Sequence, residues 1–193
     1  MDAKDIQQLR AETGAGIMEV KSALTYAGGD IEKARAELRK RGAAMAAKKG
    51  AREAGDGIVS SYIHANEKIG VLLKLYTETD FVARTKEFHE LAHDLSLHIA
   101  AAAPQYISKE DIPESVQEAE RKIYREQVAD SGKPEDIIEK IIEGKMDKFA
   151  AESVLMEQSF VKNPDQTIRE FIESYIAKLG ENIQVGDFVR YEI

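Results

Sequence analysis

The stretch from Ile58 to Thr77, IVSSYIHANEKIGVLLKLYT, decides the class of fold that this chain can adopt. It holds two runs rich in β-branched and aromatic residues, Ile58–Ala65 and Ile69–Thr77, and the polar tripeptide Asn66-Glu67-Lys68 separates them. Such runs are typical of strands, and a short polar connection between them predicts a hairpin. Alternate residues of the second run, from Ile69 to Leu75, are apolar and share one face. We therefore expect an antiparallel ribbon with one buried face.

Two helices and a late strand are expected to pack with this hairpin. Apolar residues recur at helical spacing from about Thr85 to Ala103 and from Thr167 to Leu179, and Pro104 and Gly180 end the two patterns. The residues Ile183–Ile193 predict a strand. Two early strands and one late strand, with helices between them, indicate an α+β fold in which a three-stranded antiparallel sheet is packed with helices.

The segment between these two helices predicts further helix. Proline suits the first turn of a helix, and it occurs near the start of two apolar-periodic stretches. We expect helices at about 113–130, from Lys133-Pro134 onward with Ile137, Ile138, Ile141 and Ile142 inward, and at Lys145–Met156, followed by a turn at Asn163-Pro164-Asp165.

The N-terminal part predicts a separate small domain. Residues 1–42 show three short helical patterns, which glycine-containing stretches at Thr13–Gly16 and Gly28–Asp30 interrupt. Residues 43–56 combine small and charged residues and are expected to form a linker, helical in part up to Lys49. Residues 57–193 then form the core domain. Three helices in so few residues give only a small hydrophobic core.

Composition restricts the class of protein. The chain has 193 residues and no cysteine, so disulfide bonds and thiolate metal sites are excluded and a reducing, cytoplasmic setting is expected. The N-terminus lacks the apolar core of a secretory signal, and no apolar run approaches the roughly 20 residues that cross a bilayer. We therefore expect neither export nor a membrane contact.

The net charge of −8 is unevenly distributed. The basic segment, Lys33–Arg52, contains eight basic residues and one acidic residue, so the rest of the chain is strongly acidic. A mostly acidic surface argues against broad nucleic-acid binding. The basic segment itself could contact an acidic protein surface or RNA, or it could be a solvated helix end whose cations suit the helix dipole.

One match to a catalytic motif occurs, in His89-Glu90-Leu91-Ala92-His93, which fits the HExxH zinc motif of metalloproteases. With each residue advancing about 100° around a helix, His89 lies about 100° and His93 about 140° from the apolar stripe that contains Phe88. The pair is then at the edge of the exposed face, and no third ligand stands in a recognisable motif, although a catalytic zinc needs one. A zinc-dependent hydrolase is therefore the weaker alternative.

The stretch Thr77–Arg84, TETDFVAR, permits two interpretations. Thr79 or Asp80 can cap the start of the helix that follows. Phe81 and Val82 then either pack in the core beneath that cap or present an apolar side chain, next to a carboxylate, to a partner. Sequence physics alone leaves both open.

The same stretch resembles the signature of the elongation factor Ts family, the nucleotide exchange factors for elongation factor Tu. Leu9–Leu24, LRAETGAGIMEVKSAL, resembles the family's N-terminal motif, and Gly29-Asp30 follows it. Other blocks resemble the family in order along nearly the whole chain: Tyr62–His64, Ile69–Leu72, LAHDLSLHIAA from Leu91, Gly132–Pro134, Glu143–Lys145 and Phe188–Glu192. Because LAHDLSLHIAA belongs to a family helix, the resemblance makes the zinc-motif match accidental.

The resemblance implies a fold and a mechanism. The N-terminal domain should resemble ubiquitin-associated domains and should dock on the nucleotide domain of elongation factor Tu. Asp80 and Phe81 should push between two helices near the partner's magnesium site, so that GDP leaves. The protein would be a cytoplasmic exchange factor and not an enzyme, without a cofactor or metal and without binding nucleotide itself. The implied partner-binding residues are Thr79, Asp80, Phe81, Val82, Arg84, Leu9, Arg10, Thr13, Gly14, Met18 and Val20, of which Leu9 and Val20 could instead be core.

The resemblance also implies an oligomeric state, and the N-terminal residues permit another function. The chain has one core unit, and in this it resembles short members of the family that act as homodimers, the second copy replacing the second core half of longer members. A ubiquitin-type binding module, based on residues 1–42, is the other alternative function, but it leaves the remaining residues without a role.

Overall fold

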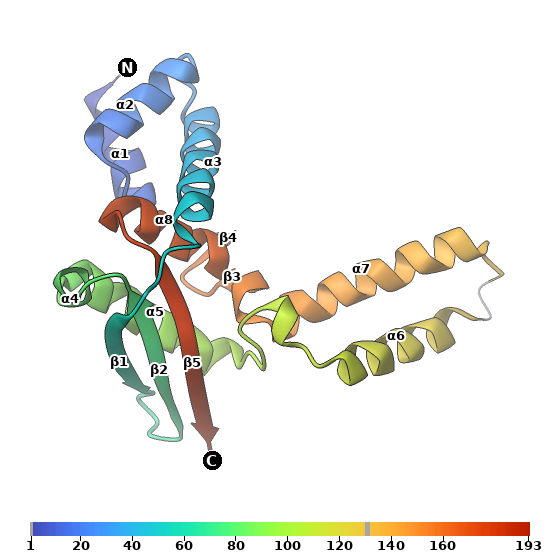
Figure 1. Ribbon diagram of the computed structural model, residues 1–193. Coiled ribbons are helices and arrows are strands. Elements are labelled where there is room, and N and C mark those ends of the chain that lie inside the picture. Colours follow the sequence, from blue (N-terminus) through green and yellow to red (C-terminus); the bar gives the residue numbers. More distant parts are fainter. Residues whose placement is uncertain (1, 130–131) are drawn as a thin grey trace. The chain divides into compact units, whose positions relative to one another are not determined.

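The expected hairpin forms and carries the main sheet. A computed structural model describes residues 2–129 and 132–193, and in it β1 (Asp56–Ile63) pairs antiparallel with β2 (Ile69–Thr77). The late strand β5 (Ile183–Glu192) pairs antiparallel with the other edge of β2, which gives the order β1-β2-β5 (Figure 1). The predicted α+β fold with a three-stranded antiparallel sheet is confirmed.

One face of this sheet is buried beneath two helices. Side chains on β2 alternate, and those from Val71 to Thr77 that face inward are buried, as the sequence predicts. α5 (Lys86–Ala102) crosses behind the sheet (Figure 1), and its apolar stripe is fully buried. α8 (Ile168–Leu179) adds further buried side chains. The buried core formed by the sheet and these helices includes Val71, Leu73, Leu75, Phe88, Leu91, Leu95, Ile99, Ile172 and Ile176.

A β-bulge interrupts the pairing of β2 with β5 between Lys74 and Leu75. Gly186 lies opposite this irregularity, and the ring of Tyr76 lies over it. A Cβ atom at position 186 would be 2.1 Å from Cε2 of Tyr76. Glycine is therefore required here by the close approach of an aromatic ring.

Three helices form the N-terminal part: α1 (Ala3–Thr13), α2 (Ile17–Tyr26) and α3 (Ile31–Lys49). Gly14 ends α1 in the left-handed conformation, and Asp30 caps α3 by accepting a hydrogen bond from the Lys33 amide at 3.0 Å. The small core holds Leu9, Val20, Ala23, Leu24, Ala34 and Leu38. Because α3 continues to Lys49, the first half of the expected linker is helical; the domain boundaries at 1–42, 43–56 and 57–193 stay a prediction.

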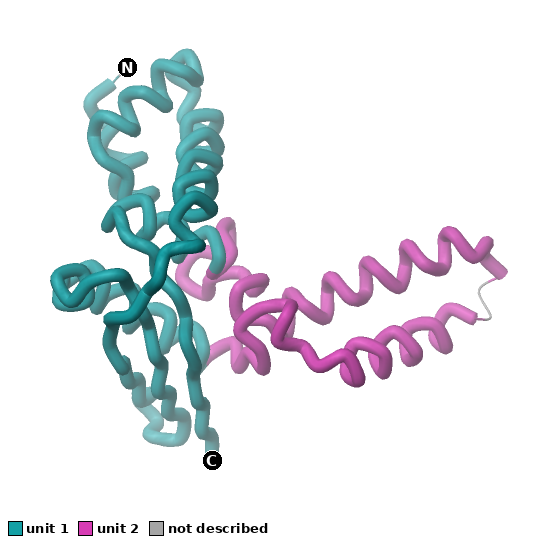
Figure 2. Tube along the Cα trace, in the orientation of Figure 1, with its two compact units in different colours: residues 1–100, 169–193 teal, residues 101–168 magenta. Residues whose placement is uncertain are grey.

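The chain divides into two compact units, one of residues up to Ala100 together with Arg169–Ile193 and one of Ala101–Ile168 (Figure 2). In the second unit α6 (Glu114–Val128) and α7 (Glu135–Ser153) run side by side, and Arg121 contacts Glu143 at 2.7 Å across them. The described residues of this unit also form the short 3-10 helices η1 (Lys109–Asp111) and η3 (Leu155–Glu157) and a two-stranded sheet of β3 (Ser159–Phe160) and β4 (Asn163–Thr167).

Three local expectations in this unit are wrong. The two predicted helices from Pro134 to Met156 are one continuous helix through Gly144, whose missing side chain faces open space. Ile137 is exposed, whereas Ile138 and Ile142 are buried, because α7 buries a narrower stripe than four isoleucines would fill. The predicted turn at residues 163–165 is strand β4, and Pro164 is tolerated there because an irregularity interrupts the pairing.

The described residues leave three positions out. Met1 falls within the expected domain 1–42, and Asp130 and Ser131 fall at and after the end of the helix expected at 113–130. These parts of the two expectations lie outside the described residues.

Candidate partner-docking site

The segment between β2 and α5 forms one helical turn that presents Phe81 to solvent. Thr79 caps this turn, α4 (Asp80–Ala83), and its hydroxyl oxygen accepts a hydrogen bond from the Val82 amide at 3.4 Å. Residues 81 and 83 lie about 200° apart around a helix. Accordingly Ala83 is buried, while the side chain of Phe81 is 81% exposed. The solvent-facing interpretation of Phe81 agrees with this geometry, whereas packing beneath the cap does not.

A charged pair lies on the same turn. Arg84 contacts the Asp80 carboxylate at 2.9 Å; the Arg84 side chain is largely exposed and that of Asp80 about half-exposed. An exposed pair of this kind contributes little to stability, so both groups can exchange this contact for one with a partner at low cost. The structure therefore brings together Asp80, Phe81 and Arg84 at the surface, with Thr79 and Val82 half-buried behind them.

Glu181 contacts this segment from the loop between α8 and β5. Its carboxylate accepts hydrogen bonds from the hydroxyl of Thr77 at 2.8 Å, the amide of Thr79 at 3.0 Å and the hydroxyl of Thr79 at 2.6 Å. Burial raises the pKa of Glu181, but the hydrogen bonds from Thr79 and Thr77 outweigh it and hold the pKa below its ordinary value. Sequence reasoning missed Glu181, because nothing local marks a residue so far along the chain.

The N-terminal candidates separate into exposed and buried residues. Met18, at the start of α2, is 72% exposed, and the neighbouring Ile17 is also exposed. Arg10 is exposed near the end of α1, Thr13 and Gly14 are half-buried where α1 ends, and the Thr13 hydroxyl donates to the Leu9 carbonyl. Leu9 and Val20 are fully buried among the three helices, so in this structure they support the surface and do not form it.

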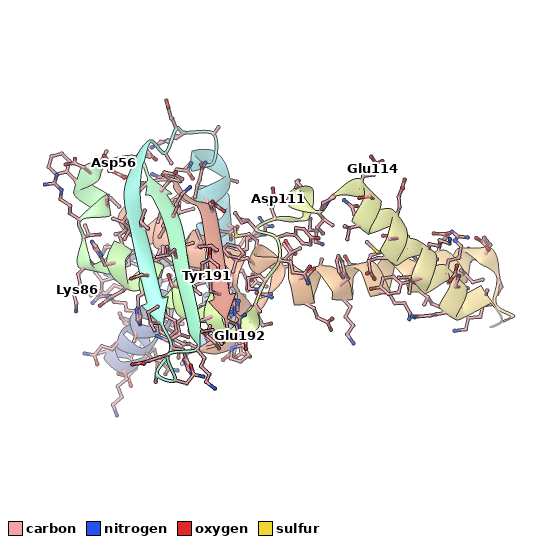
Figure 3. The ribbon with its side chains drawn as sticks, turned by 90° about the horizontal axis from the view of Figure 1, so that it is seen from below. Asp56, Lys86, Asp111, Glu114, Tyr191 and Glu192 are labelled. Carbon is pink, nitrogen blue, oxygen red and sulfur yellow. The ribbon has the colours of Figure 1, made fainter. Side chains whose placement is uncertain are left out.

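The second face of the main sheet is open and partly apolar. Val59, Ile63, Leu72 and Tyr191 are all exposed on it (Figure 3 labels Tyr191). The register places Leu72 between Ser61 and Val189, and Gly70 between Ile63 and Tyr191, so these side chains come from all three strands. This face was not predicted from the sequence; the signal that could have indicated it is Leu72, an apolar residue at an outward position of β2.

Comparison with known proteins identifies the family. A family model described as Elongation factor TS matches residues 3–193. The chain is 54% identical over 193 residues to Elongation factor Ts of Thermosipho melanesiensis, covering all of this chain and 98% of the relative. It is 52% identical to Elongation factor Ts of Fervidobacterium nodosum with the same coverage, and 51% identical over 191 residues to that of Geobacter metallireducens, covering 99% of this chain and 88% of the relative. The chain belongs to the elongation factor Ts family.

The zinc-motif match has an ordinary role in this member of the elongation factor Ts family. His89 and His93 are exposed on α5, and the ring of His93 packs edge-on against Tyr62 with 5.8 Å between ring centroids. In residues 2–129 and 132–193 no three histidine, aspartate or glutamate side chains come together as a metal site would require. Within the same described residues, no helix has the length and apolar character needed to cross a membrane.

The basic segment of this elongation factor Ts family member is partly neutralised within the chain. Arg35 contacts Glu12 at 2.6 Å and also Glu32. Arg41 contacts Glu37 at 2.8 Å, and Arg52 contacts Glu78 at 3.5 Å. Lys33 also contacts Asp30 at 3.4 Å, so four of its eight basic residues have an acidic partner within the chain.

Proposed function

We propose that this protein is a guanine nucleotide exchange factor for elongation factor Tu that acts in translation elongation in the cytoplasm. The observation that carries the proposal is the exposed Phe81 beside Asp80 on a capped turn, in a chain of the elongation factor Ts family. A large apolar side chain exposed in this way can enter a gap in a partner. It contributes most to the binding free energy where the partner excludes water from it.

The proposed mechanism is a displacement without bond chemistry. Asp80 and Phe81 push between two helices of elongation factor Tu near its magnesium site, and the weakened contacts to magnesium and phosphate release GDP. The coupling is reciprocal, since any loss of GDP affinity caused by this protein equals the loss of its own affinity caused by GDP. It therefore needs no cofactor, no metal and no nucleotide site of its own, and it is not an enzyme in the usual sense.

The N-terminal helices supply the second contact in this proposal. They act like a ubiquitin-associated domain and dock on the nucleotide domain of elongation factor Tu. The exposed Met18 and Arg10 are the side chains best placed to touch the partner. Thr13 and Gly14 shape the end of α1 beside them, while Leu9 and Val20 hold the surface from inside the core.

The test of the exchange function is the release of fluorescent GDP from elongation factor Tu in a stopped-flow instrument. We expect the release rate to rise with the concentration of this protein. Met18→Ala should need a higher concentration for the same rate, because it removes a docking contact. A release rate that stays at the intrinsic value at every concentration would contradict the proposal.

Two copies of the chain are proposed to associate through the open sheet face. This proposed association is supported by the row of exposed apolar side chains on all three strands, with Lys74 and Asp187 as a central charged pair at 3.5 Å. Light scattering at micromolar concentration should give the mass of a dimer, and Leu72→Asp should give that of a monomer. Ile123→Asp, at an exposed isoleucine of α6, is the matched control and should leave the dimer intact. A monomeric mass for the unchanged protein would refute this association.

A further inference from the structure

A single turn of four residues cannot hold Phe81 in place by itself. Forming the first turn of a helix fixes several backbone angles for one hydrogen bond, so isolated turns are unstable. Because it is 81% exposed, Phe81 contributes little packing of its own within the protein. The restraint on α4 therefore comes from the buried Ala83 and from the residues that flank the turn.

The loop Gly180–Asn182 supplies this restraint through hydrogen bonds in both directions. Glu181 accepts three hydrogen bonds from Thr77 and Thr79, as described above. In return, the Glu78 carboxylate accepts a hydrogen bond from the Asn182 amide at 2.7 Å. The backbone is thus fixed at the residues just before α4, and the Thr79 hydroxyl that caps α4 is itself bound by Glu181.

The same loop is bound to the end of α3. The side-chain amide of Asn182 donates to the Arg52 carbonyl at 2.8 Å and more weakly to that of Gly50 at 3.5 Å. The Lys49 ammonium donates to the Gly180 carbonyl. The loop therefore joins the segment that carries Phe81 to the segment that follows the N-terminal helices.

We propose that Glu181 is a positioning residue for Phe81, which acts on nucleotide exchange by fixing α4 and not by touching the partner. The inference rests on the proposed exchange function. A contact group held in its bound direction loses less conformational entropy on association, so a loosened α4 lowers the exchange rate while Phe81 itself is unchanged.

The decisive experiment is a double-mutant cycle on the exchange rate, with Glu181→Ala, Phe81→Ala and the double variant. We expect Glu181→Ala to lower the rate on the order of tenfold to a hundredfold, which is the size of effect that misplacing a contact group produces. In the double variant the loss should equal that of Phe81→Ala alone, because both changes remove the same contact. Glu53→Ala, at an exposed glutamate of the same unit, should leave the rate unchanged.

Amide hydrogen exchange of the free protein gives a second measurement that does not depend on elongation factor Tu. The peptide that contains Phe81 should exchange faster in Glu181→Ala, while peptides of α1 and α2 should be unaffected. If Glu181→Ala fails to fold, Glu181→Gln replaces it, because one carbonyl oxygen can still accept from Thr77 and the Thr79 amide; smaller changes of the same sign are then expected.

Two results would overturn the inference. One is a folded Glu181 variant with unchanged exchange rate and unchanged amide protection around Phe81. The other is a double variant whose loss is the product of the two single losses, since Glu181 would then act independently of Phe81. If the unchanged protein does not accelerate GDP release, the proposed function fails, and the amide measurement still decides whether Glu181 holds α4.

Discussion

Phe81 and Phe88 lie seven residues apart on successive helices, and the protein uses them in opposite ways. Phe88, on α5, is fully buried against the sheet, and Phe81, on α4, is 81% exposed. The buried ring is held by packing against many neighbours, so its position does not depend on any single contact. The exposed ring is held through its backbone, by the buried Ala83 and by the hydrogen bonds that Glu181 of a distant loop makes with Thr79. The difference shows that an apolar sequence pattern is enough to fix a buried side chain. An exposed side chain is fixed only where specific residues hold its backbone.

The largest effect expected from this comparison is on stability, from Phe88→Ala. Removing a fully buried ring loses its transfer free energy and leaves a cavity, so the free energy of unfolding should fall by about 3–5 kcal/mol. Urea denaturation followed by circular dichroism measures this loss. A loss below about 1 kcal/mol would mean that the α5–sheet core does not depend on this ring.

The next effect is on exchange, from Phe81→Ala. Because the ring is mostly exposed, the free energy of unfolding should change by less than about 0.5 kcal/mol. The coupling to GDP release should fall by about 1–3 kcal/mol, or roughly fivefold to 150-fold in rate. Stopped-flow release of fluorescent GDP tests this directly. Loss of stability with normal exchange would reverse the roles assigned to the two rings.

Two threonines cap the helices that carry these two phenylalanines. Thr79 caps α4, and the Thr85 hydroxyl accepts a hydrogen bond from the Phe88 amide at 3.2 Å at the start of α5. Either change to alanine should lower stability by about 1 kcal/mol, as the loss of a cap does. The Thr85 hydroxyl also donates to the Val82 carbonyl of α4 at 2.8 Å, but only Thr79 is hydrogen-bonded to Glu181, so Thr79→Ala should slow exchange more than Thr85→Ala. Equal exchange rates for the two variants would show that the hydrogen bonds between Thr79 and Glu181 do not matter for exchange.

The smallest expected effect is a pH dependence of the free energy of unfolding that arises from protonation of Glu181. Its pKa is lowered in the folded protein, because the hydrogen bonds from Thr79 and Thr77 outweigh the opposing effect of burial. Its contribution to stability is therefore fully present above the ordinary glutamate pKa, about 4.3, and is lost as pH falls through the lower folded-state value. The difference in urea midpoint between the unchanged protein and Glu181→Gln should shrink from about pH 7 to about pH 3. A difference that is the same at both pH values would argue against an ionised Glu181 in the folded state.

Much of the fold could be predicted because its signals are local. The alternation in Ile69–Thr77 and the apolar stripe of α5 follow from the geometry of strand and helix, and both predictions are confirmed. The local errors arose where tertiary contacts override propensity. Gly144 is carried inside a continuous α7, and Pro164 is accepted in a strand at an interrupted pairing.

The candidate site was predictable only in part. The resemblance pointed to Asp80 and Phe81, and the geometry shows why these residues can face a partner. Glu181 could not have been found from the sequence, because the Thr77 and Glu181 partners are separated by 104 residues and a glutamate in a loop has no signature. Burial likewise separates Leu9 from Met18, which the N-terminal motif alone treats as equals.

The separation of 104 residues between Thr77 and Glu181 delays the completion of their contact in the newly made protein. Ribosomes add about 5–20 residues per second, so Glu181 is made about 5–20 s after Thr77. During this interval β2 lacks its partner β5 and remains an unpaired edge, and the turn that carries Phe81 lacks the hydrogen bonds of Glu181 to Thr77 and Thr79. The N-terminal helices bury their core entirely among residues already made and can fold at once. The nascent chain is thus most exposed to aggregation and to chaperones while it waits for the loop and strand that complete the sheet.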